Sequence, residues 1–202
     1  MNVLLRRSGG VVAATVLAVS LAACGSSSST SDTAASPMTP TANTGAQTFG
    51  SGCSSIPTSG AGSFNGMVAD PVATAASNNP LLTTLVAAVQ KAGLVETLNS
   101  AKGLTVFAPY DPAFAKFPKA TLNSVLANKA LLTQILTHHV IAGQLNPDEI
   151  IGTHKTLNGD SVTVKGDTSG MTVDGATVLC GNIPTANATV YVIDSVLMPA
   201  TK

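Results

Sequence analysis

The sequence predicts an α+β fold, because its two halves carry different hydrophobic periods. In residues 81–89 of the first half, leucine and valine recur at helical spacing. In the second half, short alternating segments are separated by Asn-Gly at 158–159 and Asp-Gly at 174–175, which favour two-residue hairpins. Residues 104–117 join the halves with a strand pattern, a proline and a helix pattern. We therefore expect helices mainly in the N-terminal half and strands mainly in the C-terminal half.

Residues 1–23 are predicted to be an export signal. Arg6 and Arg7 precede an apolar run over residues 10–23, which is too short for a spanning helix. The sequence Leu-Ala-Ala-Cys ending at Cys24 resembles a bacterial lipobox, which implies an acylated Cys24 at the mature N-terminus. The alternative is an uncleaved anchor or an unlipidated signal.

Residues 24–63 are expected to form a disordered tether. This segment is rich in Ser, Thr, Pro and Gly, so it cannot bury enough apolar area to offset the entropy of ordering. It would hold the folded domain, expected over residues 64–200, away from the membrane. The tether offers Ser and Thr for O-glycosylation, a possibility raised by composition alone.

The central strand is expected over residues 104–108, where apolar side chains occupy both faces, and Pro109 ends it because proline cannot donate to a ladder. Asp111 before Pro112 predicts an N-cap followed by proline at the first helical position, with the helix running to Phe117.

The other elements follow from the same periods. Helices are expected over residues 70–76, 80–91, 94–98, 120–128 and 131–139, with Gly93 as a C-terminal stop. Strands are expected over residues 153–157, 161–165, 171–173, 177–179 and 189–196.

Charge and composition exclude one class of partner. Without Arg6 and Arg7, the ten basic residues fall to eight Lys against ten acidic residues. The chain therefore lacks the clustered basic residues of a nucleic-acid binder. Apolar residues make up 45% of the chain, and aromatic residues only 3%, so Ala, Val and Leu must fill the core.

Three segments of the chain resemble the boxes of the fasciclin (FAS1) domain family. LTVFAPYDPAF is similar to the first box, HVIAG to the second, and TVYVIDSVLMP to the closing one. The resemblance is closest to the single-domain secreted and lipid-anchored surface antigens of mycobacteria. The residues that match the family pattern are Thr105, Phe107, Pro109, Asp111, Phe114, His139, Gly143, Asn187 and Asp194.

The resemblance implies the FAS1 fold, in which helices flank a small two-sheet β sandwich or wedge. It also implies adhesion or contact with a host matrix. Some animal members carry an acidic residue and Ile implicated in integrin binding; the corresponding positions here are Asn182 and Ile183, so the acid is absent.

Cys53 and Cys180 are expected to form a disulfide, because an exported domain with two remaining cysteines favours one. The alternatives are two free thiols or a zinc site with a histidine. The spacing offers no ligand cluster, so we expect no metal.

The sequence predicts no catalytic site. His138 and His139 are neighbours on a helix and do not share a face, so we expect one buried and one exposed imidazole. Asp194 is expected to accept backbone N–H groups and fix a strand end. No nucleophile and base are spaced for hydrolysis, and no cofactor motif is present.

Two functions are open on this basis. The first is a lipid-anchored, non-enzymatic surface protein that faces the cell wall and mediates adhesion. Its partners would be host cell-surface or matrix proteins, with innate lipoprotein receptors recognising acylated Cys24. The second is a binder or carrier of a small apolar ligand, such as a cell-envelope lipid, in a cleft between helices and sheet.

Overall fold

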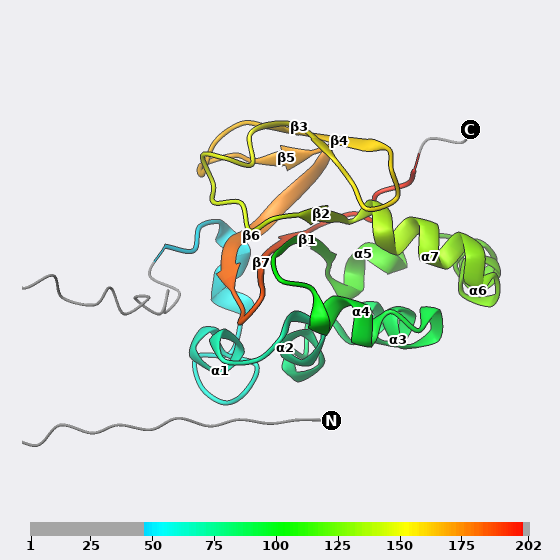
Figure 1. The fold of residues 1–202 in the computed structure, drawn as a ribbon, viewed down its shortest axis with the longest axis horizontal. Coiled ribbons are helices and arrows are strands. Elements are labelled where there is room, and N and C mark those ends of the chain that lie inside the picture. The colour runs from blue at the N-terminus through cyan, green and yellow to red at the C-terminus, as the bar shows by residue number, and fades with distance from the viewer. Residues whose placement is uncertain (1–46, 200–202) are drawn as a thin grey trace, which may run out of the picture. The chain divides into compact units, whose positions relative to one another are not determined.

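The computed structural model describes residues 47–199, so the expected signal segment and Cys24 lie outside the described residues. Helices and strands segregate as predicted for an α+β fold (Figure 1). The helices are η1 Ser51–Ser55, α1 Phe64–Val68, α2 Val72–Asn78, α3 Thr83–Ala92, α4 Val95–Ser100, α5 Asp111–Ala115, α6 Lys119–Ala127 and α7 Lys129–His138. The strands are β1 Leu104–Pro109, β2 Val140–Ala142, β3 Gly152–Lys155, β4 Ser161–Lys165, β5 Thr172–Val173, β6 Ala176–Pro184 and β7 Ala188–Ile193.

The strands follow the order β2-β1-β7-β6-β5-β4-β3. The pair β1 and β7 is parallel and every other pair is antiparallel. Strand β6 pairs with β7 at one end and with β5 at the other, with register shifts between Val178 and Ile183. The two sheets of the expected sandwich are thus joined through β6, and irregular pairing helps that strand bend from one sheet into the other.

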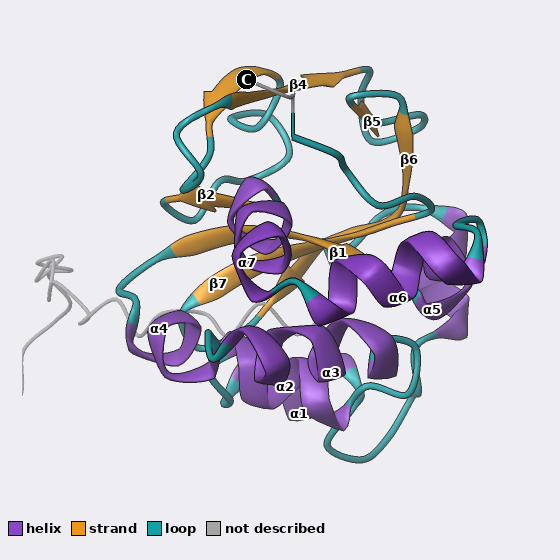
Figure 2. Ribbon diagram, turned by 90° about the vertical axis from the view of Figure 1, so that its right-hand side faces the viewer, coloured by secondary structure: helices purple, strands orange, loops and turns teal. Residues whose placement is uncertain are grey.

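Two apolar cores lie on the two faces of β1, which is buried on both. On one face, Leu104, Val106 and Ala108 pack against the helices. On the other face, Phe107 packs with Tyr191 and with apolar residues of β4, β5 and β6. In Figure 2, helices α1 to α4 lie on one side of β1 and β7, and β4 and β5 lie on the other. The strand predicted at residues 104–108 is therefore the shared wall of both cores.

The folded domain begins before Phe64, so residues 47–63 are not part of a disordered tether. Phe49 exchanges two backbone hydrogen bonds with Gly181 of β6, and its ring lies where a Cβ on Gly181 would stand. Ile56 is only 3% exposed and packs in the helical core. The prediction from composition was wrong for residues 47–63 because a few contacts with distant parts of the chain order this segment, although it is rich in Gly and Ser.

The sequence predicted Asp111 as the N-cap of its own helix, and this prediction is wrong. Asp111 is the first residue of α5, Tyr110 holds the cap position, and Pro112 follows inside the first turn. The helix also ends at Ala115 rather than at Phe117. The carboxylate of Asp111 is used elsewhere, at the N-terminus of α3.

Within residues 47–199, no helix combines the length and the apolar character needed to cross a bilayer.

Candidate functional site

An apolar cleft lies beneath helix α3, and we call it the α3 cleft. Its volume is about 160 Å³. Val106 and Phe107 of β1 and Val140 of β2 contribute on the sheet side, while Val72 and Leu98 contribute from α2 and α4. This arrangement follows from packing four short helices on one sheet face, where side chains of Ala and Val leave space unfilled.

The rim of the α3 cleft carries no charge and is mostly polar. The exposed residues that line it are Thr74, Ser77, Gln90, Thr97 and Leu157. Leu157 is 47% exposed, so an apolar side chain stands at the rim. The site can therefore take an apolar body inside and offer amide and hydroxyl groups at its opening.

Asp111 positions helix α3, which covers the cleft. Its Oδ1 accepts a hydrogen bond of 2.8 Å from the backbone N–H of Thr84, and its Oδ2 accepts one from the Thr83 hydroxyl. Leu82, the cap residue of α3, supplies no side-chain hydrogen bond. At the other end Gly93 adopts φ 76° and closes the helix, as predicted.

Asn187 fixes two further walls of the cleft. Its Oδ1 accepts a hydrogen bond of 2.8 Å from the Val72 N–H at the start of α2. Its Nδ2 donates to the carbonyl oxygens of Leu98, Asn99 and Ala101 at the end of α4. One side chain thus caps the N-terminus of one helix and the C-terminus of another, and its amide is already engaged rather than free for a glycan.

The remaining residues of the family pattern also support the scaffold. The Thr105 hydroxyl donates to the Gly143 carbonyl at 2.7 Å and accepts from Leu145 N–H at 2.9 Å, which joins β1 to the segment after β2. Asp194 Oδ1 accepts from Thr177 N–H at 2.8 Å, in the role expected for it, and its Oδ2 lies 3.1 Å from Lys116 Nζ. Pro109 is fully buried at the end of β1.

Cys53 and Cys180 form a disulfide across a sequence separation of 127. The bond holds η1 against β6, beside the Phe49–Gly181 bridge.

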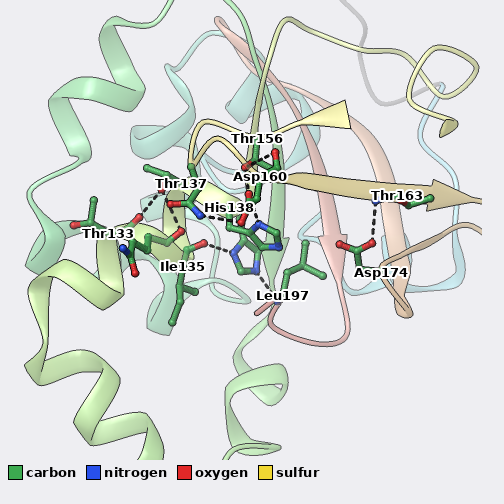
Figure 3. Close-up of polar contacts among 12 residues, drawn as sticks. Thr133, Ile135, Thr137, His138, Thr156, Asp160, Thr163, Asp174 and Leu197 are labelled. Carbon is green, nitrogen blue, oxygen red and sulfur yellow. Dashed lines mark hydrogen bonds and ion pairs between the residues drawn. The ribbon is translucent and has the colours of Figure 1, made fainter. Parts of the chain in front are cut away.

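His139 lies at the inner end of the cleft and is 2% exposed. Its Nδ1–H donates to the Ile135 carbonyl at 2.8 Å, so its Nε2 accepts the Leu197 N–H at 2.9 Å (Figure 3). Burial lowers the pKa of His139 to about 4 from an ordinary value of 6.5, although the Ile135 hydrogen bond acts in the opposite direction. The imidazole is therefore neutral at pH 7.

His138 is also buried, at 3% exposed, so the expectation of one exposed imidazole is wrong. Its Nδ1 lies 2.8 Å from Asp160 Oδ1, and Thr156 and Asn158 donate to the same carboxylate (Figure 3). Burial by itself would raise the pKa of Asp160, but these hydrogen bonds outweigh it and hold the pKa at about 2. The turn after β3 covers His138, a contact between distant segments that helical spacing does not reveal.

The His138–Asp160 pair anchors that turn to α7. Among the described residues, no hydroxyl or thiol is hydrogen-bonded to the His138 ring. Nor do three His, Cys, Asp or Glu side chains in residues 47–199 lie together as metal ligands would.

The neutral state of His139 predicts a pH dependence of stability. The folded pKa lies below the unfolded value, so the unfolded chain takes up the extra proton, and stability is lost as the pH falls from 6.5 towards 4. The free energy of unfolding should drop by about 2 kcal/mol between pH 7 and pH 5. Urea unfolding at several pH values measures this slope. In His139→Gln the slope should largely vanish, and an unchanged slope would contradict the assignment.

A family model for the fasciclin domain matches residues 80–199. The chain belongs to the fasciclin family. Immunogenic protein MPB70 of Mycobacterium bovis is 54% identical over 145 residues, which cover 69% of this chain and 75% of that protein. Cell surface glycolipoprotein MPT83 of Mycobacterium tuberculosis is 49% identical over 167 residues, or 78% of this chain and 75% of the relative.

The fold of this fasciclin protein is similar to that of a FAS1 domain pair from the insect cell adhesion molecule Fasciclin I. The TM-score is 0.55 at 15% sequence identity, covering 66% of this chain. The chain spans 52% of that structure, about half of a two-domain protein. This likeness bears on the fold, and it agrees with the architecture that the sequence motifs implied.

The sequence missed three residues with clear structural roles. Asp160 orients His138, away from the cleft. At the cleft, Asn99 Oδ1 accepts from the Ala73 N–H of α2, and Leu85 lines the cleft together with two smaller cavities. Leu85 was recognisable only as part of a helical apolar face. The spaces around it depend on how three layers meet, and no local pattern encodes that.

Proposed function

We propose that this fasciclin protein is held on the outer side of the cell membrane by acylated Cys24 and acts by binding rather than by catalysis. The support is its 49% identity to a relative named as a cell surface glycolipoprotein, together with the lipobox-like sequence before Cys24. Fasciclin membership and the scaffolding roles of the family residues fit a binding module.

Replacement of Cys24 by Ala tests the anchor. Without the thiol no diacylglyceryl thioether can form, so the protein should accumulate in the medium or as an unprocessed precursor. Two acyl chains anchor a protein stably in a membrane, and the variant carries no acyl chain. The membrane-bound fraction should therefore fall at least tenfold. Fractionation and immunoblotting measure this, with Cys53→Ala as the thiol control that should stay bound. Unaltered processing and membrane association of Cys24→Ala would contradict lipidation.

The first candidate function is adhesion, with the FAS1 domain contacting host cell-surface or matrix proteins and innate receptors recognising the acylated Cys24. A solved relative comes from a cell adhesion molecule, which supports this reading. Asn182 is 6% and Ile183 1% exposed, so such a contact would use another surface. Saturable binding of the Cys24→Ala protein to host cells or immobilised matrix proteins is the test, and absence of saturable binding to both would reject it.

The second candidate is binding of a small apolar ligand, such as a cell-envelope lipid, and the α3 cleft is the observation that favours it. Its volume of about 160 Å³ is close to that of an engineered apolar cavity that binds benzene, about 150 Å³. Native mass spectrometry after incubation with a total lipid extract is the test. Val86→Trp, which fills the cleft from α3, should abolish uptake, and Val68→Trp on α1 is the control. A mass without ligand in every sample would reject this function.

A further inference from the structure

Two smaller apolar cavities lie next to the α3 cleft, each of about 30 Å³. The first, which we call the α6 cavity, lies between α5, α6 and α7; the second lies between α1, α2 and β6. Leu85 lines all three spaces, and Leu136 and His139 line both the cleft and the α6 cavity. Only a thin partition of side chains therefore separates the cleft from the α6 cavity.

The α6 side of this space is loosely covered. Leu122, Val125 and Leu126 of α6 all line the α6 cavity, yet all three are only partly buried. No residue of α6 is fully buried among those whose side chains the structure describes. An apolar ligand entering here would take further apolar surface of α6 out of water, and burial of such surface is favourable.

The lining of the cleft carries no charge at pH 7, and this restricts the charge of the ligand. Among the lining residues His139 is the single titratable group, and it is neutral at pH 7. A buried charge without a partner is strongly unfavourable, so a carboxylate or ammonium group drawn inside the cleft would find no compensation. At the opening, the lining residues include no Lys, Arg, Asp or Glu that would pair with a charged end. Gln90 and Thr97 at the rim have no side-chain hydrogen bond within the described chain, and both are uncharged.

We propose that the α3 cleft binds an uncharged lipid with one unbranched chain, and that the chain passes the Leu85–Leu136 partition into the α6 cavity. This inference rests on the apolar-ligand function proposed above. The cleft by itself accommodates about six carbons, by comparison with the benzene-sized cavity. A longer chain fits when Leu85 and the side chains of α6 move aside, and the polar end, a hydroxyl, ester or sugar, then faces Gln90 and Thr97.

A chain-length series of 1-alkanols tests the proposal on the full chain carrying Cys24→Ala, which has no acyl group of its own to compete. Titration calorimetry with 1-pentanol to 1-decanol should show a Kd that falls about fourfold with each added CH2 group. The fall should continue beyond six carbons, to 1-decanol. A plateau at about six carbons would overturn entry into the α6 cavity while leaving the cleft as a binding site.

Two further comparisons complete the experiment. Val125→Phe fills the α6 cavity from the half-buried face of α6, and it should bring the plateau at about six carbons, whereas Val68→Phe on α1 should behave as the parent protein. Decanoate at pH 7.5 should bind at least tenfold more weakly than 1-decanol, and equal affinity would overturn the preference for an uncharged ligand. No saturable binding of any alkanol would reject the apolar-ligand function itself, together with this inference.

Discussion

Removal of the Cys53–Cys180 disulfide is expected to lower the free energy of unfolding by about 5 kcal/mol. The bond closes a loop with a sequence separation of 127 residues, so its loss gives the unfolded chain much more conformational freedom. The double variant Cys53→Ser with Cys180→Ser, compared in a Cys24→Ala background, isolates this effect from other thiols. Urea unfolding of the two proteins measures the difference.

Reductant provides the matched control for this prediction. Dithiothreitol should shift the unfolding midpoint of the parent protein to that of the double variant, and it should leave the variant unchanged. Phe49 and Gly181 exchange two backbone hydrogen bonds that do not involve the sulfur atoms, so we expect both proteins to keep β6 paired with the N-terminal segment. Identical midpoints with and without reductant would contradict a stabilising role for the bond.

Replacement of Asn187 by Ala is expected to lower the free energy of unfolding by about 3 kcal/mol. Each buried polar group left without a partner costs about 1–3 kcal/mol, and water that hydrogen-bonds to some of these groups reduces the total. Four backbone groups lose their side-chain partner, namely the Val72 N–H and the carbonyls of Leu98, Asn99 and Ala101. The effect should appear both as a lower urea midpoint and as faster hydrogen exchange in α2 and α4.

Asn158→Ala is the control for this variant, since within residues 47–199 the Asn158 side chain makes one hydrogen bond, to Asp160 Oδ2. It should cost no more than about 1 kcal/mol. Alkanol binding should weaken in Asn187→Ala, because α2 and α4 form walls of the α3 cleft, and should be unchanged in Asn158→Ala. If both variants lost the same stability, Asn187 would not be the shared cap that its hydrogen bonds describe.

The strand and helix around Pro109 could be predicted because their causes are local. Alternating apolar residues set the strand, proline ends it, and the structure places β1 and α5 where these rules put them, with α5 two residues shorter. Strand β6 was expected only over residues 177–179 but runs from Ala176 to Pro184. Gly181, Asn182 and Pro184 have low strand propensity, and pairing with β7 and with Phe49 overrides it.

Helix capping also depends on contacts between distant segments, which local sequence rules do not predict. Asp111 and Asn187 were both recognised from the family pattern, and Asp111 was assigned to its own helix because capping is usually local. In the structure each carboxamide or carboxylate caps helices that lie far away in sequence. The residue type predicts that the side chain makes hydrogen bonds, and the tertiary fold determines which backbone groups are its partners.

The sequence by itself determined the family, the α+β class and the buried central strand. It also favoured a disulfide between the two cysteines of the exported domain. Tertiary structure alone decided the α3 cleft, the covering of His138 by Asp160, and the ordering of residues 47–63. The physical reason is that hydrophobic periodicity and turn preferences depend on residues that are close in sequence. A cavity, by contrast, is the space left unfilled where side chains from several distant elements pack together.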